Sequence, residues 1–234
     1  MKCFKSLSLT VLAAVLSGAV QADELFNNGP AVGSNGKSVT ATPTASLGYG
    51  LQRASQNAVA DDFTVTGNGW LVSSLDFFAY QNNATAFTLQ NVGWSILSGD
   101  VNNGTVVASG TTALSSGGLV GYRVTAAAQT NTTKRIFLAS ADINDVALSA
   151  GHYWLRWDMT GSATSGPWQP PTSDGRTGNA LQSGNSPFAA FIDGSAVELP
   201  FVINGTLISA VPEPATWLLL LAGSLALALR RRNA

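Results

Sequence analysis

Side chains that could do chemistry are few in this sequence. His152 is the single histidine and Cys3 the single cysteine, so a catalytic zinc site and a thiol nucleophile are not expected. No G-x-S-x-G elbow supplies a nucleophilic serine. Paired carboxylates such as Asp61 and Asp62 would suit glycoside hydrolysis, but neighbouring residues of a strand point to opposite faces. The sequence therefore indicates a non-enzymatic protein. A glycoside-type hydrolase is the less favoured of two alternative functions.

Aromatic side chains offer a different chemistry, that of sugar binding. Trp168 lies in S-G-P-W-Q-P-P-T, a proline-bounded loop that would hold its indole rigidly, as stacking on the C–H face of a sugar ring requires. Trp154 and Tyr80 are the further candidates for this stacking site. The alternative is that Trp168 covers one end of the core, because tryptophan is mostly buried on average. A carbohydrate-binding module is therefore the first alternative function.

Side chains with oxygen ligands suggest one candidate metal ion, calcium. Asp61 or Asp62, together with turn carbonyls and Asn27 or Asn28, would suit a structural calcium ion, although no EF-hand loop is present. No other metal and no organic cofactor is expected.

The elements that must position these residues are strands. From Ala60 onward, alternating apolar runs recur every 10–15 residues with Gly- and Asn-rich turns between them, which is typical of an all-β protein. We predict an antiparallel two-sheet β-sandwich of jelly-roll type over residues 59–210, preceded by an irregular lead-in with short strands over residues 23–58. Alternation in G-H-Y-W-L-R-W-D places His152, Trp154, Arg156 and Asp158 on one strand face.

Both ends of the sequence carry export features. Residues 1–22 read as a signal peptide, with Lys2 and Lys5 before an apolar stretch and small residues before Asp23, so signal peptidase is an expected partner. From Asp23 to Pro214, seven basic residues stand against thirteen acidic ones, a difference of −6. This acidic balance argues against nucleic acid as a partner.

The C-terminal segment, residues 211–234, has three parts. Val211, Pro212, Glu213 and Pro214 form a stiff motif; residues 215–229 are uncharged and predict a single transmembrane helix; Arg230, Arg231 and Arg232 form a basic stop. The three parts in this order resemble the PEP-CTERM sorting signal of Gram-negative bacteria. The resemblance implies recognition by exosortase, removal of the tail, and an organism that makes exopolysaccharide.

A more diffuse resemblance covers roughly residues 58–208. A-D-D-F, L-S-A-G-H-Y-W-L-R-W and L-P-F-V-I-N-G, in this order, are similar to a domain of bacterial secreted proteins of uncharacterised role. Together these features predict a protein that is exported across the inner membrane and transiently anchored there. It then reaches the cell surface or the extracellular matrix, and extracellular polysaccharide or biofilm is its expected association.

Overall fold

Thirteen strands and one short helical turn make up the described part of the chain. The computed structural model describes residues 22–40, 46–184 and 187–209. The strands are β1 Asp23–Asn27, β2 Lys37–Val39, β3 Tyr49–Gly50, β4 Asn57–Val65, β5 Trp70–Ala79, β6 Leu89–Ser98, β7 Thr105–Ala113, β8 Ser115–Val124, β9 Arg135–Leu148, β10 Gly151–Gly161, β11 Trp168–Gln169, β12 Leu181–Gly184 and β13 Phe201–Leu207. A 3₁₀ helix, η1, spans Arg53–Ser55.

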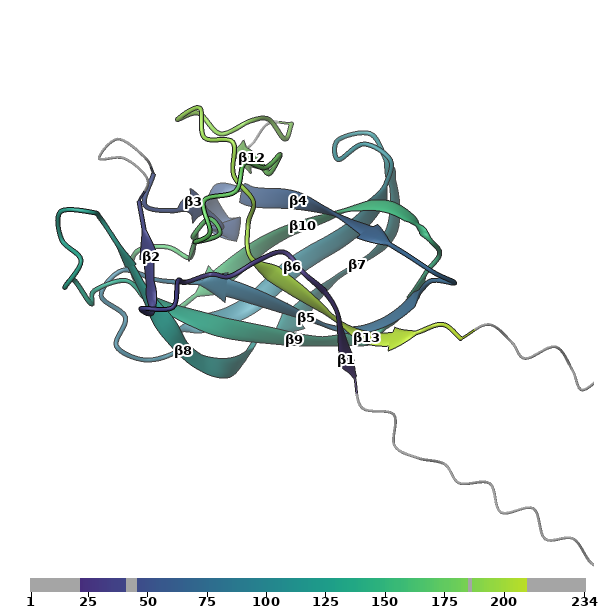
Figure 1. The fold of residues 1–234 in the computed structure, drawn as a ribbon, viewed down its shortest axis with the longest axis horizontal. Coiled ribbons are helices and arrows are strands. Elements are labelled where there is room, and N and C mark those ends of the chain that lie inside the picture. Colours follow the sequence, from purple (N-terminus) through teal and green to yellow (C-terminus); the bar gives the residue numbers. More distant parts are fainter. Residues whose placement is uncertain (1–21, 41–45, 185–186, 210–234) are drawn as a thin grey trace, which may run out of the picture.

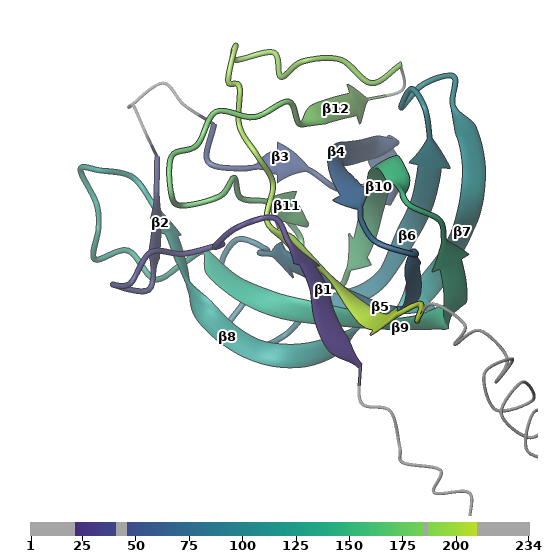
Figure 2. The same cartoon turned by 45° about the vertical axis from the view of Figure 1, so that its right-hand side comes forward.

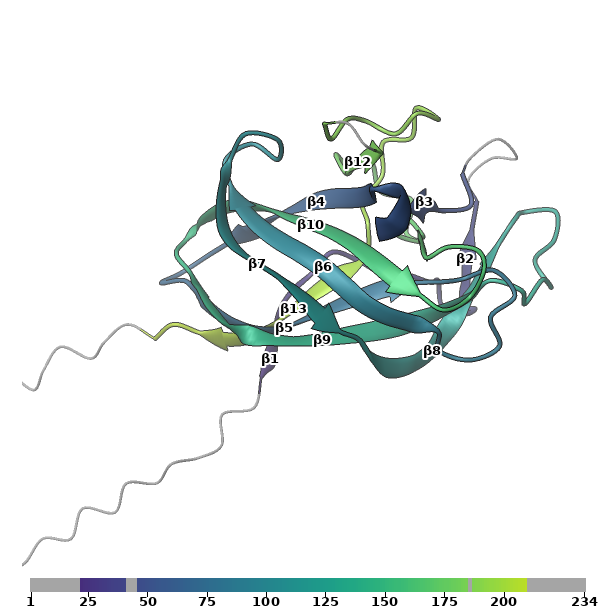
Figure 3. The ribbon, with the colours of Figure 1, turned by 180° about the vertical axis from the view of Figure 1, so that it is seen from behind.

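The strands form two layers that face each other (Figure 1). The larger sheet has six strands in the order β1-β13-β5-β9-β8-β2, and the smaller has five in the order β12-β4-β10-β6-β7. A third sheet is formed by β11 and β3 alone. All pairings are antiparallel except that of β2 with β8. The predicted all-β sandwich is thus confirmed, and Figure 3 shows the five-stranded sheet from its outer side.

The strand order agrees with the jelly-roll type of the prediction. A jelly roll winds one long hairpin, so that the first main strand pairs with the last and the second with the last but one. Here β1 pairs with β13, β4 with β10, β5 with β9 and β6 with β7. β8 is an additional strand that pairs with β9, and β2 and β12 lie at sheet edges. Turn signals give the positions of strands but not their partners, so only the structure identifies the individual pairs.

The core forms where the inward residues of both sheets meet. On β10, Tyr153, Leu155 and Trp157 are buried while the residues between them are partly exposed. The Trp157 ring lies 5.6 Å from that of Phe77 and 5.7 Å from that of Phe201, both on the opposite sheet. The period of two in the sequence therefore selects the core face, as an antiparallel sheet with one solvated face requires.

The two ends of the described chain lie side by side. β1 pairs with β13 so that Asp23 is opposite Gly205, and Figure 2 shows β1 beside β13. The predicted lead-in therefore begins with a strand of the large sheet, and β3 within it pairs with β11. No helix in the described ranges has the length and hydrophobicity to cross a membrane. The predicted transmembrane segment 215–229 lies outside those ranges.

Candidate functional site

The outer face of the five-stranded sheet carries a band of polar side chains. As the alternation predicts, His152, Trp154, Arg156 and Asp158 of β10 all lie on this solvent side. Strand register sets their neighbours. Asp158 is opposite Gly93 of β6, which is opposite Thr111 of β7. In the adjacent row, Arg156 is opposite Ser95, which is opposite Ser109.

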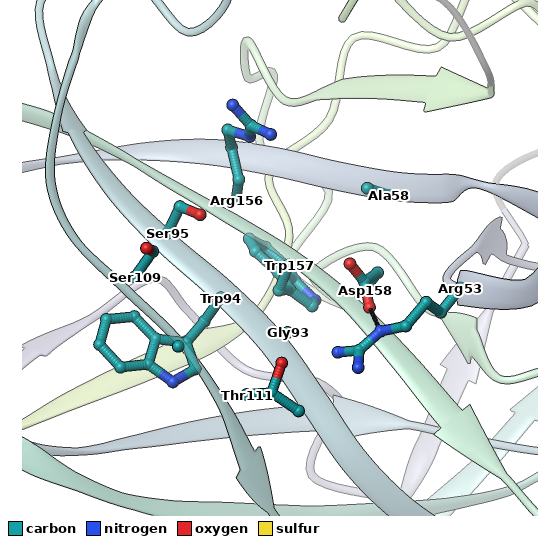
Figure 4. A pocket seen from close by; sticks show the side chains of 11 residues that line it. Arg53, Ala58, Gly93, Trp94, Ser95, Ser109, Thr111, Arg156, Trp157 and Asp158 are labelled. Atoms are coloured by element: carbon teal, nitrogen blue, oxygen red, sulfur yellow. Dashed lines mark hydrogen bonds and ion pairs between the residues drawn. The ribbon is translucent and has the colours of Figure 1, made fainter.

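These two rows border a groove of about 510 Å³ (Figure 4). In these two rows the central strand β6 contributes only Gly93 and Ser95, while β10 contributes the longer Arg156 and Asp158. Small residues between large ones leave a hollow. The lining residues are Arg53, Ala58, Gly93, Trp94, Ser95, Ser109, Gly110, Thr111, Arg156, Trp157 and Asp158.

Arg53 reaches this groove from η1, a turn of helix that ends where Gln56 adopts a left-handed conformation with φ of 57°. Its Nε donates to Oδ1 of Asp158, an ion pair drawn in Figure 4. Gly93 makes room for the guanidinium, since a Cβ there would lie 2.3 Å from Arg53 Nη2. That Nη2 is shielded from solvent and has no hydrogen-bond partner in the described part of the chain.

Arg156 is positioned by stacking rather than by pairing. Its guanidinium carbon lies 5.1 Å from the centre of the Phe188 ring, within the range of a cation–π contact. Its Nε is shielded from solvent and lacks a partner among the described residues. Figure 4 shows Ser95 and Ser109 between Arg156 and Trp94. The groove thus combines two guanidinium groups, one carboxylate and three hydroxyl side chains.

The three predicted sugar-stacking residues do not form one site. Tyr80 is only 2% exposed, so its ring cannot contact a ligand, and this part of the prediction is wrong. Trp168 packs with Tyr80 and Ile136 in a second hydrophobic cluster, where its backbone exchanges hydrogen bonds with that of Tyr80. Only Trp154 lies on the outer face, with its ring centre 6.2 Å from that of His152.

The predicted calcium ligands belong to a cluster of carboxylates. Oxygens of Asp61, Asp62 and Glu198 lie within 4.8 Å of one another, although Asp61 points to the interior and Asp62 to the outer face. The two aspartates do point to opposite faces, as expected, yet one oxygen of each approaches Glu198 where the segment before β13 passes β4. Glu198, 136 positions beyond Asp62, was missed because sequence spacing does not show such contacts.

Asp61 is fully buried in this cluster. Its Oδ2 accepts hydrogen bonds from the Leu199 amide at 2.7 Å and from Asn28 Nδ2 at 2.9 Å, while Oδ1 accepts one from the Asp62 amide. Burial raises the pKa of Asp61 to about 9, and the charge of Glu198 adds to this, although the Leu199 amide opposes it. Such a cluster must share a proton or accept a cation, and its oxygens are of the kind that calcium prefers.

The other side chains considered for catalysis each contact a neighbouring charged side chain and do not converge on one another. His152 Nε2 contacts Oδ2 of Asp62 on the exposed face. Asp158 is paired with Arg53, whereas Asp174 is paired with Arg176. Asp61 has no exposed surface with which to meet a substrate.

The comparisons with known proteins concern the C-terminal segment. Residues 210–232 match the family model described as the PEP-CTERM protein-sorting motif. The chain carries a PEP-CTERM sorting motif. The match includes the predicted motif from Val211 to Pro214 and the basic stop from Arg230 to Arg232, all outside the described residues. No curated protein matches the sequence. The PEP-CTERM motif implies export, processing by exosortase and a location at the cell surface or outside the cell.

Several residues of the groove were not recognised from the sequence. Arg53, Gly93, Ser95, Ser109 and Thr111 come from separate elements that only the strand register brings together. A usable signal was present in the alternation of N-V-G-W-S, where small residues occupy the outward positions of a strand whose neighbour carries charges.

Proposed function

We propose that the folded body is a non-enzymatic module of the cell surface or extracellular matrix. The observation that carries this proposal is the PEP-CTERM motif at residues 210–232, which directs the protein to that location. Support for a non-enzymatic role comes from the most perturbed carboxyl group, Asp61, which is buried beyond the reach of a substrate. Extracellular polysaccharide, and hence biofilm, is the proposed association.

A second candidate function is that of a carbohydrate-binding module, and the groove favours it. Sugar-binding sites combine hydrogen-bonding side chains with an aromatic surface, and the outer face offers hydroxyl groups, guanidinium groups and Trp154. The proposed sugar contact therefore lies on the five-stranded sheet and not at Trp168. Before processing, residues 215–229 would anchor the protein in the inner membrane.

The sorting part is tested in hosts with and without exosortase. We expect full-length protein in the membrane fraction of the deficient host, and a form shortened within the C-terminal segment outside cells of the other. Mass spectrometry of the C-terminal residue measures this difference. Equal release of one mature form from both hosts would contradict the proposal.

The role of the body is tested with purified protein and the polysaccharide fraction of the producing organism. We expect the protein to sediment with the polymer and to release no new reducing ends. Release of reducing ends, abolished by Asp61→Asn or Glu198→Gln, would instead identify a hydrolase. Absence of co-sedimentation would contradict a polysaccharide association.

A further inference from the structure

We propose that the groove on the five-stranded sheet binds the carboxylate of a uronic acid unit in an anionic polysaccharide. This inference rests on the proposed polysaccharide association and names the class of polymer. Arg156 and Arg53 are the residues that would bind the carboxylate.

The two arginines of the groove have N–H groups without an acceptor among the described residues. Arg53 uses Nε for Asp158, but no hydrogen bond from its Nη atoms is present in the described part of the chain. Arg156 donates none within the same ranges. A shielded N–H without an acceptor is unfavourable, and a ligand oxygen in the plane of the guanidinium would relieve it. Carboxylates match this planar fork with two parallel hydrogen bonds.

The lining of the groove is positively charged. Among the residues that line the groove, two arginines stand against the single carboxylate of Asp158, which leaves one positive charge in excess. The segment between the two export features has the opposite sign, with a difference of −6. The groove can therefore attract an anion although the net charge of the whole segment is negative. Asp158 disfavours a dianion beside it, which points to a singly charged carboxylate rather than a phosphate monoester.

The groove also offers contacts for the parts of a sugar other than its carboxylate. Ser95, Ser109 and Thr111 supply hydroxyl groups along the floor, and these can donate to and accept from sugar hydroxyls. Trp154 precedes Arg156 by two residues on the same face of β10, which places it about 7 Å away along the strand. An indole at that distance can contact a neighbouring sugar unit. The combination suits a polymer of acidic sugars better than a small free anion.

The test measures binding of the purified full chain in detergent to immobilised polygalacturonate, sulfated dextran and neutral dextran. We expect polygalacturonate to bind most tightly. Arg156→Gln should weaken this binding about tenfold or more, because hydrogen bonds to a charged group are lost. Ser95→Phe should also abolish it by filling the floor without changing the charge. Lys134→Gln, which removes one positive charge next to the six-stranded sheet, is the matched control and should bind like the parent protein.

Equal binding of neutral dextran and polygalacturonate would overturn the inference, as would preference for sulfated dextran. Unchanged binding by both groove variants, each shown to be folded by its melting temperature, would also overturn it. These outcomes are separable from failure of the proposed function. A protein that sediments with the native polysaccharide yet ignores the groove variants supports the polysaccharide association and refutes this site.

Discussion

Replacing Asp61 with asparagine tests the physical account of the carboxylate cluster. Burial and Glu198 raise the pKa of Asp61 to about 9, whereas an unfolded aspartate loses its proton near pH 4. Between these values the folded protein keeps a proton that the unfolded chain releases. The folded state therefore binds more protons, and the free energy of unfolding must fall as the pH rises.

The size of the effect follows from that difference. One proton per molecule corresponds to about 1.4 kcal/mol for each pH unit, so stability should fall by roughly 4 kcal/mol from pH 5 to pH 8. Asp61→Asn removes this slope because an amide does not ionise in this range. It also costs about 1 kcal/mol at every pH, since both oxygens of Asp61 accept backbone N–H groups and the amide nitrogen can accept neither.

The two profiles should therefore cross. We expect the Asp61→Asn variant to be less stable than the parent at pH 4 and more stable at pH 8, as measured by urea unfolding with tryptophan fluorescence. Asp62→Asn is the control, because it removes a neighbouring carboxylate but leaves Asp61 in place, and the slope assigned to Asp61 should survive. Parallel profiles for the parent and Asp61→Asn would show that Asp61 is ionised in the folded protein, which would refute the reasoning.

Three further substitutions test the packing and the groove. Trp168→Ala should destabilise the protein by about 2 kcal/mol, because the indole packs in the second cluster, and it should leave polysaccharide binding unchanged; reduced binding at equal stability would contradict this placement. Gly205→Ala should lower the melting temperature by roughly 10 °C, since its Cβ would lie 2.1 Å from the Leu71 carbonyl oxygen; an unchanged melting temperature would contradict the close strand contact. Gly93→Ala should displace Arg53 and weaken polygalacturonate binding with little change in melting temperature, and retained binding would show that Arg53 does not contribute.

The local features of the fold were predictable because they depend on neighbours in sequence. Alternation placed His152, Trp154, Arg156 and Asp158 on one face of their strand, and the structure has all four on the solvent side. A period of two along one strand needs no knowledge of its partners. The individual strand pairs could not be read in the same way, since pairing depends on contacts between distant segments, although the observed order follows the predicted jelly roll.

The candidate sites show the same division. Asp61 or Asp62 was predicted as a calcium ligand, but Glu198 joins them only through the path of the chain before β13. Tyr80 was judged by its residue type, yet its ring is buried beneath the loop of Trp168. The groove combines residues of β4, β6, β7, β10 and η1, and only the register of the sheet places Arg53 over Gly93.

The pairing of β1 with β13 brings the two ends of the folded domain together. Asp23, the expected first residue after signal peptide removal, lies opposite Gly205, near the point where the C-terminal segment leaves the sandwich. From Ile208 to Pro214 the tether has seven residues and reaches about 25 Å at most. If residues 215–229 span the bilayer, the folded body must stay within that distance of the lipid surface, with the β1–β13 end directed toward it. Cleavage of so short a tether would release a domain that is already folded.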